Sequence, residues 1–219
     1  MSPITITQLA GVIYSAGKVF DGLSTGRLDT ENFLRSGGTE GIVSRADLAL
    51  LEDLRDAAHI VLDHNGYLDA AFVRAINASL TRSAALHPGQ YRTADQHIGV
   101  STRYGRHAPE PVTDESLQTL LDNALDTHNV HEAAIRVFVT LARAQPFEDG
   151  NKRTALLAAN TVLLTASTNT LLVVPVDDGD PSIAERFNDL LATAYVHADD
   201  SGVVAMLLRD GIVPLPHGD

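Results

Sequence analysis

The sequence predicts a mostly α-helical protein with a small β-hairpin. Apolar residues recur at helical spacing through most of the 219 residues. Residues 155–164 are apolar almost all round, as in a helix buried at the centre of a bundle. Residues 90–107 differ, because β-branched and aromatic residues lie between glycines there without a helical period. This second pattern favours a short exposed hairpin.

Three helices are predicted before the hairpin, and each follows a residue that can cap a helix. The caps are Thr7, Ser44 and Asp69. Asp47 stands three residues after Ser44, which resembles the spacing of a capping box. The apolar faces of these helices are formed by Leu9, Val12, Ile13 and Ala16, by Leu48, Leu51, Leu54, Ala58, Val61 and Leu62, and by Phe72, Val73, Ile76 and Leu80.

Five more helices are predicted after the hairpin. Thr113 begins the first of them, with acidic residues in its first turn, and Pro181 suits the first position of the fourth. Residues 171–176 are rich in β-branched side chains and predict either a short strand or an extended connector. The five helices cover roughly residues 113–124, 130–142, 155–164, 180–191 and 201–208.

The composition is that of a globular domain. Hydrophobic residues make up 44% and charged residues 20% of the chain, which argues against disorder, and the length suits one substantial core. Gly37–Gly38 is the only plausible internal boundary. We expect a helical N-terminal region over residues 1–83 and a core over residues 84–219, joined in one compact unit.

Composition also narrows the location and the partners. No apolar run approaches the length of a membrane span, and the first residues lack the basic region of a signal peptide. The absence of cysteine excludes disulfides and thiolate metal sites. A net charge of -12 argues against nucleic acid as a main partner. We expect a cytoplasmic protein that binds neither membranes nor nucleic acid. The sequence does not decide between a monomer and a homodimer.

The stretch 145–156, Gln-Pro-Phe-Glu-Asp-Gly-Asn-Lys-Arg-Thr-Ala-Leu, carries most of the chemical information. Gly150 permits a turn that other residues resist, and the amides after it can form an anion site where the next helix begins. Lys152 and Arg153 add cationic charge for phosphate oxygens, and Asp149 offers a hard oxygen ligand for Mg²⁺. The alternative is a polar loop whose charges are solvated.

This stretch resembles the signature of the Fic/Doc (Fido) family, His-x-Phe-x-Asp/Glu-Gly-Asn-Gly/Lys-Arg. It matches at Phe147, at Asp149 and through residues 150–153, and it departs at Gln145, where the family has its catalytic histidine. The resemblance implies a Fic/Doc-type helical bundle around a buried central helix, with a β-hairpin flap. It also implies transfer of AMP from ATP to a protein hydroxyl group. The Doc branch, which shares Lys152, transfers a phosphate instead.

The resemblance implies a role for each matched residue. Asp149 would bind Mg²⁺, Phe147 would anchor the loop, and Arg153 would act in catalysis through the phosphate oxygens. The residues implied in binding the phosphates of ATP are Gly150, Asn151, Lys152 and Arg153.

Gln145 leaves two hypotheses open. An amide cannot take a proton from a hydroxyl group as histidine does, and a missing general base typically lowers the rate about 10²- to 10⁴-fold. In the first hypothesis the chain is a Fic-type AMP transferase of weak activity, or a Doc-like toxin that transfers phosphate. In the second it is a nucleotide-binding pseudoenzyme that acts with a partner protein, such as a small antitoxin. His107 could reach the site, although contact with a target or with water suits a flap histidine better.

Three short motifs before the signature resemble the flap of the family, at residues 89–92, 97–100 and 106–109. An exposed strand edge can hold a segment of a target protein through main-chain hydrogen bonds. An ordinary surface loop is the alternative. The flap residues expected to bind the target are His97, Ile98, Gly99 and Val100.

Residues 36–41, Ser-Gly-Gly-Thr-Glu-Gly, match the loose pattern of the family's inhibitory helix, in which Ser36 and Glu40 are the defining positions. A carboxylate placed there would repel a phosphate group. Leu156 replaces the arginine that would pair with Glu40, and Gly37–Gly38 are poor helix formers. A glycine-rich turn before the next helix is therefore the favoured alternative.

Overall fold

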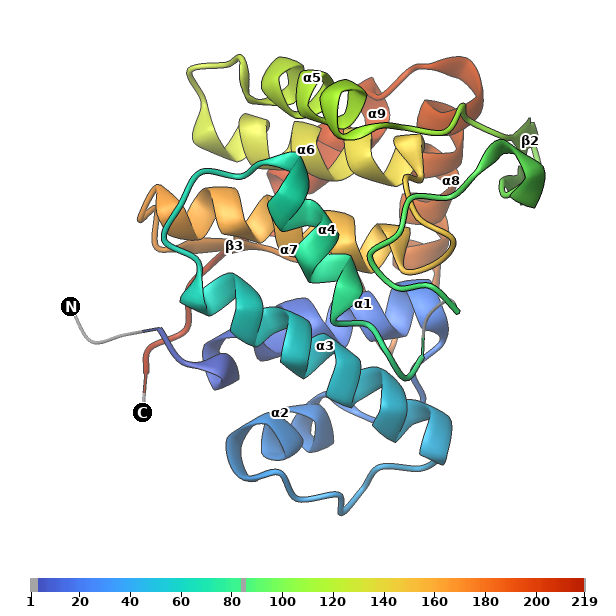
Figure 1. The fold of residues 1–219 in the computed structure, drawn as a ribbon. Coiled ribbons are helices and arrows are strands. Elements are labelled where there is room, and N and C mark those ends of the chain that lie inside the picture. Colours follow the sequence, from blue (N-terminus) through green and yellow to red (C-terminus); the bar gives the residue numbers. More distant parts are fainter. Residues whose placement is uncertain (1–3, 84–85, 219) are drawn as a thin grey trace.

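The computed structural model describes residues 4–83 and 86–218, and it confirms a mostly helical fold with a small hairpin (Figure 1). The helices are α1 (Ala10–Asp21), α2 (Arg27–Ser36), α3 (Arg45–Asp63), α4 (Ala70–Ala78), α5 (Asp114–Leu125), α6 (Val130–Ala144), α7 (Asn151–Thr165), α8 (Ser182–His197) and α9 (Ser201–Met206). The strands are β1 (Val100–Thr102), β2 (Gly105–His107), β3 (Thr170–Leu172) and β4 (Ile212–Pro214). Short helical turns cover Ile6–Leu9, Ala94–Gln96 and Leu207–Gly211.

Helix α7 runs through the centre of the bundle, with α6 on one side and α1 and α3 on the other (Figure 1). Ten of its 15 residues are buried, as its apolar sequence predicts. The buried polar side chain of Asn160 ties the helix to β3, because its amide nitrogen donates to the Leu172 carbonyl at 2.8 Å and its oxygen accepts from the Leu172 amide at 2.9 Å. The central helix therefore has a fixed axial position.

The described residues form two antiparallel two-stranded sheets, of which the first is a hairpin. In the first, Val100 pairs with His107 and Thr102 with Gly105, so the predicted hairpin forms in the second half of residues 90–107. In the second, Thr170 pairs with Pro214. The segment after residue 170 is therefore a three-residue strand followed by an extended connector, and its partner β4 was not predicted.

In the N-terminal region, two of the three predicted helix caps are confirmed and one is wrong. Ser44 and Asp69 cap α3 and α4, because their side chains accept from the amides of Asp47 and Phe72. The prediction of Thr7 as the first cap is wrong. Thr5 takes this position, with its amide donating to Gln8 Oε1 at 2.9 Å, and a 3-10 turn leads into α1.

The N-terminal helices and the later helices share one hydrophobic core. Val12 and Ile13 of α1 and Leu51 of α3 belong to the same buried cluster as Leu156 and Leu157 of α7. Helix α2 is peripheral and mostly polar, which explains why periodicity did not predict it; only Thr30, Phe33 and Leu34 of its residues are buried. Within the described residues, no helix has the length and apolarity needed to cross a membrane.

Gly150, immediately before α7, provides a matched test of this packing. Gly150 and Gly37 share a left-handed backbone, with φ of 73° in both and ψ of 8° and 4°. A Cβ on Gly37 would meet nothing within 4 Å, whereas one on Gly150 would lie 2.6 Å from Leu80 Cδ1. We expect Gly37→Ala to cost roughly 1–2 kcal/mol of unfolding free energy from backbone strain. Gly150→Ala should cost about 1–3 kcal/mol more from overpacking. Urea unfolding of both variants measures the difference, and equal losses would contradict the close packing of Gly150 on Leu80.

Candidate functional site

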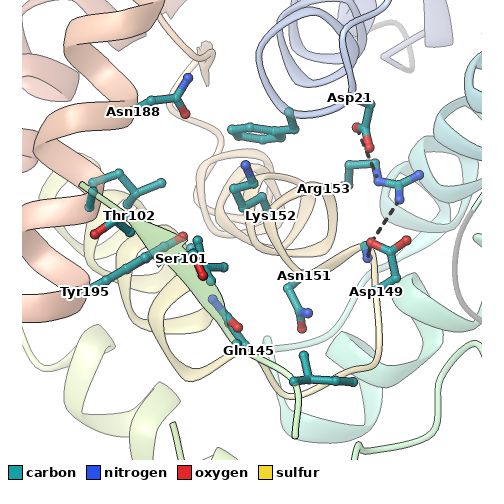
Figure 2. A pocket seen from close by; sticks show the side chains of 18 of the residues that line it. Asp21, Ser101, Thr102, Gln145, Asp149, Asn151, Lys152, Arg153, Asn188 and Tyr195 are labelled. Atoms are coloured by element: carbon teal, nitrogen blue, oxygen red, sulfur yellow. Dashed lines mark hydrogen bonds and ion pairs between the residues drawn. The ribbon is translucent and has the colours of Figure 1, made fainter. Parts of the chain in front are cut away.

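A cavity of about 640 Å³ lies where α7 begins, between the end of α1, helix α8 and strand β1 (Figure 2). Its lining brings together most residues of the signature stretch and most of the predicted flap. The residues that line it are Phe20, Asp21, Ile98, Gly99, Val100, Ser101, Thr102, Arg103, Ala142, Gln145, Glu148, Asp149, Gly150, Asn151, Lys152, Arg153, Glu185, Asn188, Asp189, Leu191, Ala192 and Tyr195.

Gln145 ends helix α6 in a left-handed conformation, with φ of 44° and its amide donating to Leu141. Its side chain is almost wholly buried at the cavity wall. Buried Arg92 fixes the backbone here, because its Nε donates to the Gln145 carbonyl at 2.6 Å and its amide donates to the Pro146 carbonyl at 2.9 Å. The position where the signature has histidine is therefore held rigidly and faces the cavity.

Phe147 and Asn151 hold the loop between α6 and α7 in shape. Phe147 is buried and stacks on Tyr91 with ring centroids 5.7 Å apart, which is the anchoring position that the sequence indicates. The Asn151 side chain bonds the Phe147 backbone in both directions, accepting from its amide at 2.8 Å and donating to its carbonyl at 2.9 Å. The Asn151 side chain therefore acts as a clamp that holds the loop in shape. The sequence did not predict this contact.

Asn77 of α4 is a second clamp, and its only signal in the sequence is a polar residue beside an apolar helix face. Its amide nitrogen donates to the Asp149 carbonyl at 3.0 Å and to Thr154 Oγ1 at 3.1 Å. Its oxygen accepts from the Gly89 amide at 2.8 Å. One buried side chain therefore joins α4, the loop before the flap and the start of α7.

The first turn of α7 presents unpaired amides to the cavity. The first helical backbone bond runs from Thr154 to the Gly150 carbonyl at 2.9 Å, so the amides of residues 151–153 have no partner within the helix. Oriented amides at a helix N-terminus attract anions. The left-handed Gly150 turns the chain so that these amides follow directly on the loop.

Arg153 lies beneath this turn and is only 2% exposed. Its Nε lies 3.4 Å from Asp21 Oδ2 and its Nη2 lies 3.6 Å from Asp149 Oδ1 (Figure 2). Its Nη1 donates to Ser83 Oγ at 2.8 Å. Ser83 in turn donates to Asp53 Oδ2 at 2.7 Å. Asp53 is fully buried and also accepts from the amides of residues 81–83. The guanidinium is thus held from three directions.

Lys152 and Asp21 face each other across the same end of the cavity. The Lys152 ammonium lies 4.9 Å from the centre of the Phe20 ring. Burial lowers the pKa of Lys152, and the nearby Asp21 carboxylate opposes that shift. Burial likewise raises the pKa of Asp21, against the effect of Arg153. Both groups therefore lose hydration in the free protein. A phosphate bound to Lys152 would compensate this loss for the ammonium group but would repel the Asp21 carboxylate.

Asp21 is the main site residue that sequence reasoning missed. It is the last residue of α1, directly before left-handed Gly22, and only the fold brings it to Arg153. Ser36 and Glu40 are not brought to the site. Helix α2 ends at Ser36, Gly37 caps it in a left-handed conformation, and Glu40 is exposed in the turn that follows. Residues 36–41 therefore form the glycine-rich turn that was the favoured alternative, and not an inhibitory helix, because the glycines stop the helix.

The flap closes the cavity from the side of α8. Of the expected flap residues, Ile98, Gly99 and Val100 line the cavity, whereas His97 does not; the His97 carbonyl accepts from Arg106 at 2.7 Å. The hairpin tip is held on α8, because Arg103 Nη2 lies 2.5 Å from Asp189 Oδ2.

His107 packs against the bundle behind the flap. Its Nε2 bonds the Arg143 carbonyl at 2.7 Å, and its ring stacks on Tyr195. His107 does not belong to the cavity lining. These contacts favour a structural role for this histidine over the role of a substitute base.

These features define a helical-bundle protein with a flap-covered cavity, lined by amides and cations, at the start of its central helix. Residues 67–163 match the family model described as Fic/DOC family. This segment, which includes both the flap and the signature loop, is therefore similar to the Fic/DOC family.

Solved structures support the same fold. A Fic domain containing signaling protein from Bacteroides thetaiotaomicron is 19% identical, with a TM-score of 0.64, and the match covers 95% of this chain and 83% of that one. Fic-1 from C. elegans is 18% identical, with a TM-score of 0.69 over 90% of this chain. This chain spans only 58% of that Fic-1 chain. No curated protein sequence matches the chain.

Proposed function

We propose that this protein binds ATP with Mg²⁺ in the cavity and transfers AMP to a hydroxyl group of a target protein, at a rate lowered by Gln145. The observation that carries the proposal is the convergence of the amides of residues 151–153 with Lys152 and Arg153 at one end of the cavity. Backbone amides and cations together are the groups that hold phosphates. Similarity to the Fic/DOC family, which includes AMP-transferring enzymes, supports the assignment.

The charge of the cavity favours binding of the nucleotide together with a divalent cation. Five carboxylates line it (Asp21, Glu148, Asp149, Glu185 and Asp189), against three cationic side chains (Arg103, Lys152 and Arg153). A triphosphate placed in this net negative environment would be repelled. A bound Mg²⁺ would supply the missing positive charge.

Asp149 fits the role of the Mg²⁺ ligand. Its side chain is 58% exposed, and its Oδ1 accepts from the Gly150 amide at 2.5 Å. Its Oδ2 makes no hydrogen bond to another described residue. Within residues 4–83 and 86–218, no cluster of three or more histidine or carboxylate side chains could hold a metal. One carboxylate is nevertheless sufficient for Mg²⁺, since the ion usually takes its other ligands from phosphates and water.

Gln145 limits the chemistry. Its amide can hydrogen-bond to a target hydroxyl but cannot remove the proton. The loss of a general base is worth roughly 10²- to 10⁴-fold in rate. The amides and cations that would bind phosphate are independent of this side chain, so binding should persist where transfer is slow.

Strand β1 is the surface proposed for the target protein. It pairs with β2 along one side only, and residues 100–102 line the cavity. A target segment that adds to this free edge would place one of its side chains over the cavity. The main-chain bonds would hold the segment whatever its sequence.

A second candidate function rests on Lys152. The Doc branch carries lysine at this position, so a phosphate transferase working with a small antitoxin, or a nucleotide-binding pseudoenzyme acting through a partner, is the alternative. Label from the γ-phosphate rather than the α-phosphate of ATP would identify the phosphate transferase.

The ion pair between Asp21 and Arg153 predicts how a substitution at Asp21 changes the affinity for Mg²⁺–ATP. Mg²⁺–ATP should raise the unfolding temperature by mass action. Asp21→Asn should tighten Mg²⁺–ATP binding roughly tenfold, because it removes a charge that repels phosphate and competes for Arg153. Glu40→Gln is the control and should leave the affinity unchanged, since Glu40 is exposed and lies outside the cavity lining. Isothermal titration calorimetry measures both. A lack of nucleotide binding in the unmodified chain would refute the proposed function.

Restoring histidine at position 145 separates a weak enzyme from a binding protein. Gln145→His supplies a group with a pKa near neutrality beside the proposed phosphate site. We expect at least a hundredfold rise in transfer of α-phosphate label to the protein itself or to lysate proteins. Gln145→Asn is the control and should stay as slow as the unmodified chain. If the histidine variant binds Mg²⁺–ATP but modifies nothing, the pseudoenzyme is the correct alternative.

A further inference from the structure

The cavity has a charged end and a neutral end, which Figure 2 separates clearly. The charged end lies at the start of α7, where Asp21, Lys152 and Arg153 meet. The neutral end lies beside β1 and carries hydroxyl and amide groups, while the adjacent Arg103, which also lines the cavity, is paired with Asp189. The polar residues of the neutral end are Ser101, Thr102, Gln145 and Tyr195.

Tyr195, on α8, is the most constrained residue of the neutral end. It is 6% exposed. Its ring stacks on His107 with centroids 5.2 Å apart and planes at 23°. His107 is itself fixed by the bond from its Nε2 to the Arg143 carbonyl at 2.7 Å. Packing therefore sets the direction of the phenol group, which points from α8 toward β1 in Figure 2.

The hydroxyl group of Tyr195 is buried and has no hydrogen-bond partner among the described residues. A buried hydroxyl without a partner is unfavourable and uncommon. The remaining tyrosines are either paired or exposed. Tyr14 bonds Asp178 at 2.6 Å, Tyr91 bonds Asp114 at 2.7 Å, Tyr104 bonds Asp189 at 3.0 Å, and Tyr67 is 91% exposed.

The two key groups of the neutral end complement an alcohol. Burial raises the pKa of the Tyr195 phenol, so it stays protonated near neutral pH and acts as a donor. The Gln145 side chain bonds no described residue and offers an accepting oxygen. A hydroxyl group can accept one hydrogen bond and donate another, which matches this pair. A phosphate at this end would have to compete with Asp189 for Arg103, because that cation is already paired.

We propose that the neutral end is a binding subsite for an alcohol group, in which Tyr195 donates a hydrogen bond to the hydroxyl oxygen and Gln145 Oε1 accepts one from it. The inference rests on the proposed function for the identity of the ligand. The alcohol is carried either by a side chain of the target protein or by the ribose of the nucleotide. Both sources share the chemistry that Tyr195 recognises.

Stability provides the first test, because a binding role and a structural role predict opposite results. Tyr195→Phe removes a hydroxyl that has no protein partner, so the variant should be at least as stable as the unmodified chain in urea unfolding. Tyr14→Phe is the matched control and should lower the stability, because it breaks the bond to Asp178. A loss in Tyr195→Phe as large as that in Tyr14→Phe would overturn the subsite, since the hydroxyl would then already be satisfied within the protein.

Binding identifies the source of the alcohol. If it is the ribose, Tyr195→Phe should weaken Mg²⁺–ATP about tenfold in calorimetry and leave Mg²⁺–2′,3′-dideoxy-ATP unchanged. If it is a side chain, both nucleotides should bind the variant normally. N-acetyl-threoninamide and N-acetyl-tyrosinamide should then bind it about tenfold more weakly in an NMR titration, with N-acetyl-alaninamide as the control. No dependence on Tyr195 in either experiment overturns the proposal. If the chain binds no nucleotide, the proposed function fails, whereas the amide titration and the stability comparison still decide the subsite.

Discussion

The buried guanidinium of Arg153 is the constraint around which the site is organised. A buried charge is tolerated only where paired and hydrogen-bonded acceptors surround it. Its acceptors come from distant parts of the chain, namely Asp21 at the end of α1, Ser83 after α4 and Asp149 in the signature loop. The N-terminal region and the core are therefore joined at the site by one charge, in addition to the apolar core that they share.

These contacts fix the position of the Arg153 guanidinium and also pair its charge before any ligand binds. Ser83 holds the guanidinium through a neutral hydroxyl, and buried Asp53 fixes Ser83. Asp21 balances the charge but opposes a bound anion, because its carboxylate repels phosphate and competes for the same guanidinium. A bound phosphate would replace the carboxylate and keep the hydroxyl contact. The proposed function thus requires an exchange of partners rather than the assembly of a new site.

Local features of the site were predictable from the sequence, and long-range ones were not. The central helix, the turn at Gly150 and the caps at Ser44 and Asp69 follow from periodicity and from neighbouring residues. Asp21 and Asn77 act through contacts 132 and 72 residues away (Arg153 and the Asp149 carbonyl), which no local pattern encodes. The glycines of residues 36–41 already favoured a turn, but its distance from the cavity was not predictable, because a short pattern says nothing about where its turn lies in the fold. Helix α2 was missed because it buries little apolar surface.

The two ends of the cavity are expected to bind different chemical groups. The charged end suits phosphates, and the neutral end suits an alcohol, with Gln145 where a base would be required. A crystal structure with Mg²⁺ and a non-hydrolysable ATP analogue tests the exchange at Arg153 most directly. We expect a phosphate oxygen to replace Asp21 as the partner of Arg153 while the bond from Arg153 to Ser83 is retained. A nucleotide bound in the cavity with the Asp21–Arg153 ion pair intact would contradict this.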